Sequence, residues 1–132
     1  MKMNQVNDMI TRMRNAQKAG LIKVLLYKPT SQLCINILYE LKQQGFIENY
    51  TVNFLKNRQT VVFLKLNSVG LPVMQNIRII SKPGRRVYIK NKHLWNIKQG
   101  QGIFILSTPH GIMSHIYAKL NNYGGEILLQ IY

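Results

Sequence analysis

Residues 106–115, with the sequence LSTPHGIMSH, place several potentially reactive side chains around one glycine. The reactive groups are the hydroxyls of Ser107 and Thr108 and the imidazoles of His110 and His115. A hydroxyl next to an imidazole can supply the nucleophile and the base of a hydrolase. Two imidazoles can also bind a metal ion. A third hypothesis is a loop whose hydroxyls contact phosphate or ribose.

The pattern gives little support to catalysis or to metal binding. The nucleophile motif G-x-S-x-G is absent, and Glu126 is the only carboxylate in the second half of the chain that could orient a base. His110 and His115 are five residues apart rather than four, and no third ligand lies near them in the sequence. We therefore expect no enzyme, no metal, no cofactor and no small-molecule substrate. A hydrolase built on Ser107 with His110 or His115 remains the alternative.

The chain carries a large positive charge. Its 132 residues include 18 Lys and Arg against four acids, a net charge of +14. Because Lys and Arg displace counterions from phosphates, we expect a nucleic-acid partner. A membrane partner is not expected, since no apolar run approaches the roughly 20 residues of a span and no Lys-rich amphipathic helix is evident. A module for DNA or for an anionic membrane surface remains a further hypothesis.

Two groups of elements must position these side chains. Residues 1–67 alternate between amphipathic helical patterns and β-rich runs in the order α-β-α-β-β, ending in a hairpin around KNRQ. Residues 68–73, SVGLPV, are expected to form a connector. Residues 74–132 form a second lobe that is mostly β with one or two short helices. The predicted fold class is therefore α+β in two small lobes.

A helix is expected within the second lobe, from Gly111 to about Leu120. Ser107 and Thr108 would then cap this helix after Pro109. The exposed amides of its N-terminus would favour a phosphate, and the hydroxyls could bond to a ribose 2′-OH. Capping alone is the simpler interpretation of the two hydroxyls.

A second candidate is the basic segment of residues 80–92, ISKPGRRVYIKNK, which contains no acid. Pro83 favours a turn, and the period of two along the following strand places Arg86 and Tyr88 on one face. A guanidinium beside an aromatic ring suits phosphate binding and base stacking. The alternative is a solvated basic face with Tyr88 packed between strands. The candidate RNA-binding residues of this segment are Lys82, Arg85, Arg86 and Tyr88.

The first lobe contributes four further candidates for contacts to phosphate. Arg12 and Arg14 lie on the first predicted helix, although solubility alone would explain these two arginines equally well. Thr30 and Ser31 precede the second predicted helix, which Gly45 ends, and both residue types are also good helix caps. Contact with an RNA backbone and helix capping are therefore both open for these hydroxyls.

Several stretches of the chain, in order and at matching spacing, resemble one family. The stretches are NDMITRMRNAQ, KPTSQL, LKQQGFIENY, ISKPGRRVY, LSTPHGIMSH and GGEIL. Together they resemble the small-subunit ribosomal protein eight family in its bacterial and organellar form. The resemblance extends over nearly the whole chain, and the blocks SxPGxRxY, ST-x-x-G and GGEI are jointly specific.

The resemblance implies a structural constituent of the small ribosomal subunit that binds directly to a helix in the central domain of small-subunit ribosomal RNA and supports its assembly. Neighbouring small-subunit ribosomal proteins would be its other partners. In the family, the ST-x-x-G loop enters an irregular minor-groove region of an RNA hairpin. A Pro-Ser-Ser segment of the family, matched here by Thr30 and Ser31, lies against RNA backbone. The carried-over RNA-binding residues of the second lobe are Ser107, Thr108, Gly111 and Tyr88, supported by Gly124, Gly125 and Glu126. His110, in the same loop, is a further candidate for RNA binding that the family pattern does not supply.

The chain departs from the family pattern in two places. A third hydroxyl and a polar residue, often Lys, usually stand where this chain has Pro109 and His110, so one hydroxyl and one amide donor are missing. In the last helix, HIYAKL replaces the usual acidic and Arg residues. The acid-poor composition, rich in Ile and Asn, suggests an organelle-encoded protein of the mitochondrion, with a plastid or the bacterial cytoplasm as alternatives.

Overall fold

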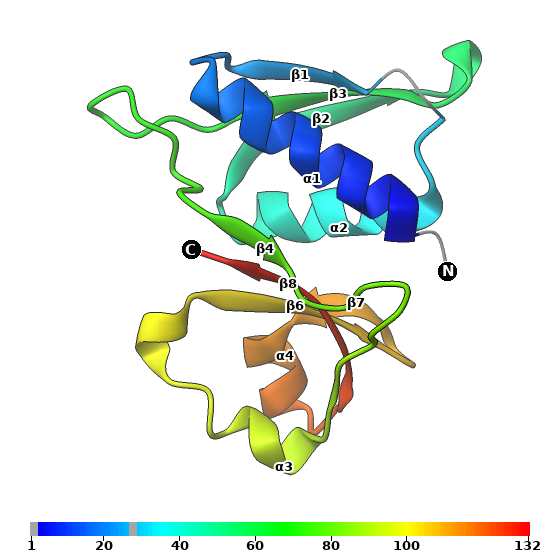
Figure 1. Cartoon of the computed structure of the whole chain (residues 1–132), viewed down its shortest axis with the longest axis vertical. Coiled ribbons are helices and arrows are strands. Elements are labelled where there is room, and N and C mark those ends of the chain that lie inside the picture. Colours follow the sequence, from blue (N-terminus) through cyan, green and yellow to red (C-terminus); the bar gives the residue numbers. More distant parts are fainter. Residues whose placement is uncertain (1–2, 27–28) are drawn as a thin grey trace. The chain divides into compact units, whose positions relative to one another are not determined.

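A computed structural model describes residues 3–26 and 29–132. The chain divides into two compact units, Met1–Met74 and Gln75–Tyr132 (Figure 1). Each unit combines helices with an antiparallel sheet, which confirms the predicted α+β class. Among the described residues, none of the helices combines the length and the apolar character that a membrane crossing requires. The expected lobe limits and the connector at residues 68–73 stay predictions.

The first unit has the predicted order of elements, and its three strands pair antiparallel in the order β1-β3-β2. Along β3 every second residue is buried, so one face of the sheet is covered by the two helices, which lie side by side in Figure 1. Tyr27 and Lys28, expected at the end of the first strand and after it, lie outside the described residues. The elements are α1 (Met3–Lys18), β1 (Lys23–Leu26), α2 (Gln32–Gln43), β2 (Ile47–Asn53), the 3-10 turn η1 (Phe54–Lys56) and β3 (Gln59–Leu64).

Both helices of the first unit follow from local sequence signals. The three- and four-residue spacing of the buried side chains Val6, Met9, Ile10 and Met13 gives α1 one apolar face. The Ser31 side chain accepts a hydrogen bond from the Cys34 amide and caps α2. The predicted helix starts and stops are therefore close to the observed ones.

The second unit contains a five-stranded antiparallel sheet. Its strand order is β4-β8-β6-β7, and β5 also pairs with β8. The prediction of a mostly β lobe with short helices is confirmed. The elements are β4 (Ile77–Ile79), β5 (Tyr88–Ile89), α3 (Asn91–Leu94), the 3-10 turn η2 (Gln99–Gln101), β6 (Ile103–Thr108), β7 (Gly111–Ser114), α4 (His115–Leu120) and β8 (Gly125–Ile131).

The two faces of this sheet have different surroundings. One face packs on α3 and α4 through a buried cluster that includes Leu94 and Ala118 of the helices and Leu106 and Ile127 of the strands. Since side chains alternate along a strand, the residues next to Leu106 and Ile127 point to the other face. Ser107 and Glu126 are those neighbours, and they are paired in register. We call the face that carries them the polar face.

The predicted helix from Gly111 to Leu120 is wrong in its first half. Gly111–Ser114 forms strand β7, paired with β6, and the helix α4 begins only at His115. Ser114 is its N-cap and accepts a hydrogen bond from the Tyr117 amide at 3.3 Å. Gly111, with φ of 118°, does not have a helical backbone, and the residues after it continue a hairpin. Ser107 and Thr108 therefore cap no helix, and the proposed phosphate site at a helix N-terminus does not exist there.

Candidate nucleic-acid interface

The polar face brings together three predicted site residues from three strands. Tyr88 of β5 and Ser107 of β6 are both in register with Glu126 of β8. Tyr88 is 69% exposed, whereas Glu126 is only 5% exposed. An exposed ring, a half-buried hydroxyl and a buried carboxylate thus lie on neighbouring strands.

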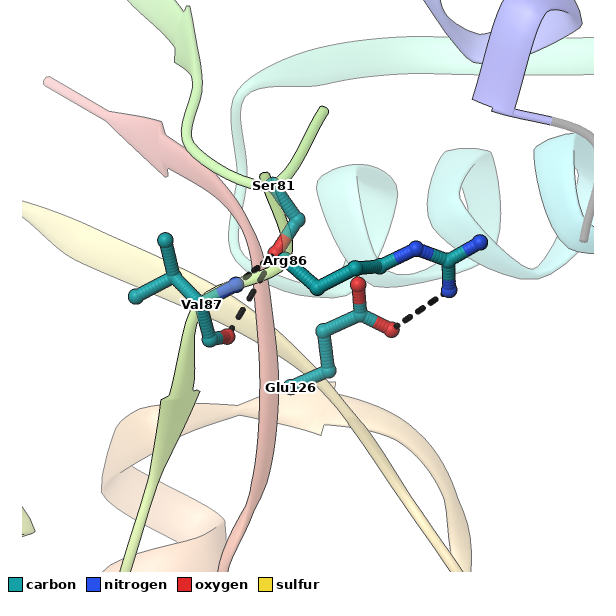
Figure 2. A network of polar contacts seen from close by, with 4 residues as sticks. All are labelled: Ser81, Arg86, Val87 and Glu126. Atoms are coloured by element: carbon teal, nitrogen blue, oxygen red, sulfur yellow. Dashed lines mark hydrogen bonds and ion pairs between the residues drawn. The ribbon is translucent and has the colours of Figure 1, made fainter. Parts of the chain in front are cut away.

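Glu126 is a buried carboxylate that is only half satisfied. Its Oε1 lies 3.5 Å from Nη1 of Arg86, as Figure 2 shows. Its Oε2 is buried and has no hydrogen-bond partner within the described part of the chain. A buried acceptor without a donor destabilises the folded protein by about 1–3 kcal/mol, and more when it is charged. The arrangement therefore lacks one hydrogen-bond donor for Oε2 among the described residues.

Ser81 fixes the segment that carries Arg86 and Tyr88. Its hydroxyl accepts a hydrogen bond from the Val87 amide at 3.0 Å (Figure 2). The Ile127 amide donates to the Val87 carbonyl at 2.8 Å, which aligns the segment along β8. Val87 packs against the helix-side cluster, so its two neighbours in sequence point to the polar face, as the sequence pattern predicts.

The two adjacent hydroxyls of the ST-x-x-G loop have different surroundings. Thr108 is buried, and its Oγ1 donates to the Gly111 carbonyl at 2.9 Å and accepts from the His110 amide at 3.1 Å. These bonds close the turn between β6 and β7. Ser107 is half-buried on the polar face, and no hydrogen bond of its hydroxyl occurs among residues 3–26 and 29–132. Ser107 is thus the hydroxyl available to a ligand, and Thr108 shapes the loop.

The two imidazoles of the segment have separate structural partners. His110 is exposed and stacks on Tyr123, with ring centroids 4.0 Å apart and an interplanar angle of 17°. His115 is buried, and its Nδ1 accepts a hydrogen bond from the Phe104 amide at 3.0 Å. Burial, followed by the nearby Lys119 cation, lowers the pKa of His115 below its ordinary value. Both residues therefore have packing roles.

The geometry gives the hydrolase and metal hypotheses no support. Within the described ranges, no hydrogen bond joins Ser107 to either imidazole, and Glu126 contacts Arg86 rather than a histidine. The same part of the chain holds no group of three or more His, Cys, Asp or Glu side chains that could bind a metal ion.

The predicted glycines of the site allow the backbone to pack closely. A Cβ on Gly125 would lie 2.3 Å from the Ser107 carbonyl oxygen, and one on Gly124 would lie 2.8 Å from the Ile89 carbonyl oxygen. Gly111 instead provides the positive φ that follows the turn. Gly124 and Gly125 thus determine how closely β5, β6 and β8 approach one another, and Gly111 shapes the hairpin of β6 and β7.

Lys82 and Arg85 lie next to a basic hollow of about 350 Å³. The turn between them is closed by two reciprocal backbone hydrogen bonds, of 2.9 and 3.0 Å. Arg78 of β4 also lines the hollow and was missed from the sequence, although it is the only charged residue in the run IRII. Tyr123, the stacking partner of His110, was missed as well; its position directly before GGEI was the available signal.

The four candidates of the first unit are arranged differently. Thr30 and Ser31 are buried; the Thr30 hydroxyl bonds to the Thr60 hydroxyl at 2.7 Å, and Ser31 caps α2. Arg12 and Thr30 line a small hollow of about 40 Å³, and Arg14 is half-buried on α1. Both hydroxyls are thus engaged inside the unit, and of the four candidates only Arg12 has an exposed side chain.

Taken together, the chain is a basic α+β protein of two units, and one sheet of the second unit carries the polar face. It belongs to the ribosomal protein S8 family, whose model matches residues 4–132. It is 42% identical to small ribosomal subunit protein uS8 of Acidiphilium cryptum, over 96% of this chain and 97% of that protein. Identity is 41% to the uS8 proteins of Mesorhizobium japonicum and Rickettsia bellii, with 96% and 98% of this chain covered and 96% and 97% of theirs. The family resemblance seen in the sequence motifs is confirmed.

Proposed function

We propose that this chain is a structural constituent of the small ribosomal subunit that binds small-subunit ribosomal RNA directly, at a helix of the central domain, and supports its assembly. Membership of the S8 family and the net charge of +14 support the proposal. Neighbouring small-subunit ribosomal proteins are its other partners. The proposed role is structural rather than enzymatic.

The observation that carries the RNA assignment is the half-satisfied carboxylate of Glu126. The chain has only four acids, and this one is buried on the polar face beside Arg86. Phosphate oxygens only accept hydrogen bonds, so they cannot satisfy Oε2. The 2′-hydroxyl and the base N–H groups of RNA do donate, and they are displayed in the shallow minor groove. A nucleic-acid minor groove therefore supplies the donor that the protein lacks.

The other residues of the face complement this contact. Ser107 can donate to and accept from a 2′-hydroxyl, and Tyr88 offers an exposed ring for stacking on a base or ribose. Phosphates on either side are contacted by the cations around the basic hollow and by His110 at the hairpin tip. The proposed backbone-binding residues are Lys82, Arg85, Arg86 and Arg78 in the second unit, and Arg12 and Arg14 in the first, whereas the buried hydroxyls of Thr30 and Ser31 are kept for packing and capping inside the first unit.

The test is binding of the full chain to a transcript of the central-domain hairpin, compared with the same hairpin carrying 2′-deoxyribose. Ser107→Ala should weaken binding to the RNA by about 0.5–1.5 kcal/mol, since one hydrogen bond is lost. The loss should vanish with the deoxy hairpin if Ser107 reads the 2′-hydroxyl. Ser68→Ala, which removes an exposed hydroxyl from the first unit, is the control. Equal RNA affinity of wild type and Ser107→Ala would contradict the assignment.

A second test addresses the ribosomal role directly. Sedimentation of cell extracts should place the chain with small ribosomal subunits, and footprinting should show protection in the central domain of their RNA. A pool found only free of ribosomes would argue against the proposal.

For the cellular compartment, we propose the mitochondrial ribosome. The acid-poor composition, rich in Ile and Asn, supports an organelle-encoded chain. The relatives compared are bacterial proteins, so a plastid or the bacterial cytoplasm are the alternatives. Detection of the chain in purified mitochondria, protected from added protease, would support the mitochondrial assignment, and its absence there would exclude it.

A further inference from the structure

The outer surfaces of α3 and α4 carry a group of exposed apolar side chains. Single exposed apolar side chains are common, but a contiguous group of them often marks a contact surface for a partner. Their exposed fractions range from 43% to 67%, and we call the group the helical patch: Trp95, Ile116, Tyr117 and Leu120.

The helical patch is continuous across the two helices, which lie side by side in Figure 1. On α4, Ile116 and Tyr117 are four and three residues before Leu120, a spacing that makes all three neighbours on one surface. Nζ of Lys119 lies 4.7 Å from the centre of the Trp95 ring. Lys119 also follows Ile116 at the i, i+3 spacing, so its aliphatic stem joins the tryptophan to the residues of α4.

The helical patch and the polar face lie on opposite sides of the second unit. The inner side of α4 packs on the sheet through Ala118, in the cluster that contains Leu106 and Ile127. Ser107 and Glu126 point away from that cluster, toward the opposite side of the sheet. An RNA bound to the polar face therefore leaves the helical patch free for a different partner.

Charge and chemistry define that partner. Basic residues flank the patch, namely Lys92 and His93 of α3 and Lys119 of α4, and after Glu48 the only acid of the chain is Glu126. A second copy of the chain would bring like charge against like charge. Phosphates would find no partner among the apolar side chains at the centre. Trp and Tyr are the residue types that contribute most to protein interfaces, particularly inside a polar rim.

We propose that the helical patch is the docking surface for a neighbouring small-subunit ribosomal protein whose contacting segment is apolar at its centre and acidic at its edge. This inference rests on the proposed ribosomal function and identifies the kind of partner that the second unit binds. The complementary charges orient the partner, and burial of the aromatic and aliphatic side chains supplies the affinity.

The first test is photocrosslinking in small ribosomal subunits reconstituted with the full chain. One version carries Leu120→p-benzoylphenylalanine in the helical patch, and its matched counterpart carries Tyr88→p-benzoylphenylalanine on the polar face. We expect the Leu120 probe to crosslink to a protein segment that contains Asp or Glu, identified by mass spectrometry. The Tyr88 probe should crosslink to RNA.

The outcomes separate the two proposals. If the Tyr88 probe crosslinks to RNA while the Leu120 probe reaches only RNA, a second copy of the chain or nothing, the docking proposal is overturned and the RNA-binding proposal stands. If the chain fails to join small subunits and the Tyr88 probe reaches no RNA, both proposals are overturned.

The second test is a matched charge change at one position. Leu120→Asp should repel an acidic segment and lower the crosslink yield from a probe at Tyr117 by about tenfold or more, as expected for loss of a central interface contact. Leu120→Lys removes the same apolar side chain but keeps the charge complementary, so its yield should fall less. Both variants should bind the RNA hairpin like wild type, which also shows that they fold. Equal crosslink yields from the two variants would overturn the proposal that the contacting segment of the partner is acidic.

Discussion

Ser107 and Thr108 illustrate how adjacent residues of the same chemical type acquire different roles. Alternation along β6 directs Ser107 to the polar face and Thr108 to the helix-covered side, where it lies near Met113 Sδ. The threonine hydroxyl is occupied by backbone groups of the turn, whereas the serine hydroxyl stays available. Substitutions of the two residues should therefore have separable effects.

Thr108→Ala should destabilise the protein more than it weakens the direct contact to RNA. It leaves the Gly111 carbonyl and the His110 amide without their partner, at an expected cost of about 1–2 kcal/mol in the free energy of unfolding. Urea unfolding measures this cost, and Thr108→Ser, which keeps the hydroxyl, should restore most of it. Ser107→Ala should leave the unfolding curve unchanged. A stable Thr108→Ala variant would contradict the role assigned to this hydroxyl.

His115 should make stability depend on pH. Its pKa in the folded protein is lowered, first by burial and then by Lys119, from the ordinary value of 6.5. The unfolded chain therefore takes up a proton before the folded protein does as the pH falls. Stability should be full above pH 6.5 and should decrease as the pH falls below that value toward the folded-state pKa.

The measurement compares unfolding free energies at about pH 7.5 and about pH 5. His115→Asn should flatten the dependence, because an amide oxygen can accept the Phe104 hydrogen bond without titrating. His93→Asn, which changes an exposed histidine of α3, should behave like wild type. If His115→Asn keeps the wild-type pH dependence, another group is responsible.

At the level of elements, the hairpin of β6 and β7 positions the candidate site. The apolar residues after Gly111 are compatible with a short helix or with a strand. They form strand β7 because they pair with β6. Helix α4 is then limited to His115–Leu120, with Ser114 as its cap. A helix-terminal phosphate site is thereby replaced by a hairpin next to β8, in which side chains of neighbouring strands lie together on one face of the sheet.

The close approach of β6 and β8 can be tested with glycines. Gly125→Ala should destabilise the second unit by about 1–3 kcal/mol, because its Cβ would collide with the Ser107 carbonyl oxygen and the backbone must shift. Gly84→Ala is the matched control, since nothing lies within 4 Å of a Cβ there and its φ is not positive. The control should be neutral or slightly stabilising. Similar unfolding curves for the two variants would contradict the packing explanation.

At the level of the whole molecule, the excess of cations should make RNA binding strongly dependent on salt. Arg85→Gln should reduce the slope of log affinity against log salt by about one, as expected for one lost phosphate contact. Lys42→Gln, an exposed lysine of α2 outside the proposed contacts, should leave the slope unchanged. An unchanged slope for Arg85→Gln would make the basic segment a solvated surface rather than a phosphate-binding one.

Arg86 is less suited than Arg85 to the test of salt dependence. Its guanidinium is paired with buried Glu126, so Arg86→Gln would also leave a carboxylate without its partner. Loss of stability would then be mixed with loss of a phosphate contact. The pairing could not be predicted from the sequence, in which the two residues are 40 positions apart.

Local sequence signals determined the class of the protein and its elements. The spacing of Val6, Met9, Ile10 and Met13 specifies α1, Ser31 caps α2, and the ordered motifs identify the family. These features depend on residues close together in the chain, and periodicity and capping report them well. Net charge, which depends on composition alone, likewise indicated a polyanionic partner.

Only the tertiary structure decided which of the candidate side chains can meet a ligand together. Strand register places Ser107 and Tyr88 on the two sides of Glu126 and turns Thr108 inward, and Oε2 of Glu126 is left without a donor among the described residues. A slip of one residue in the pairing of a strand would move each of its side chains to the opposite face of the sheet. Because register arises from contacts between distant segments, no local pattern specifies it. The sequence by itself thus identifies the residue types of the site, and the pairing of β5, β6 and β8 assigns their roles.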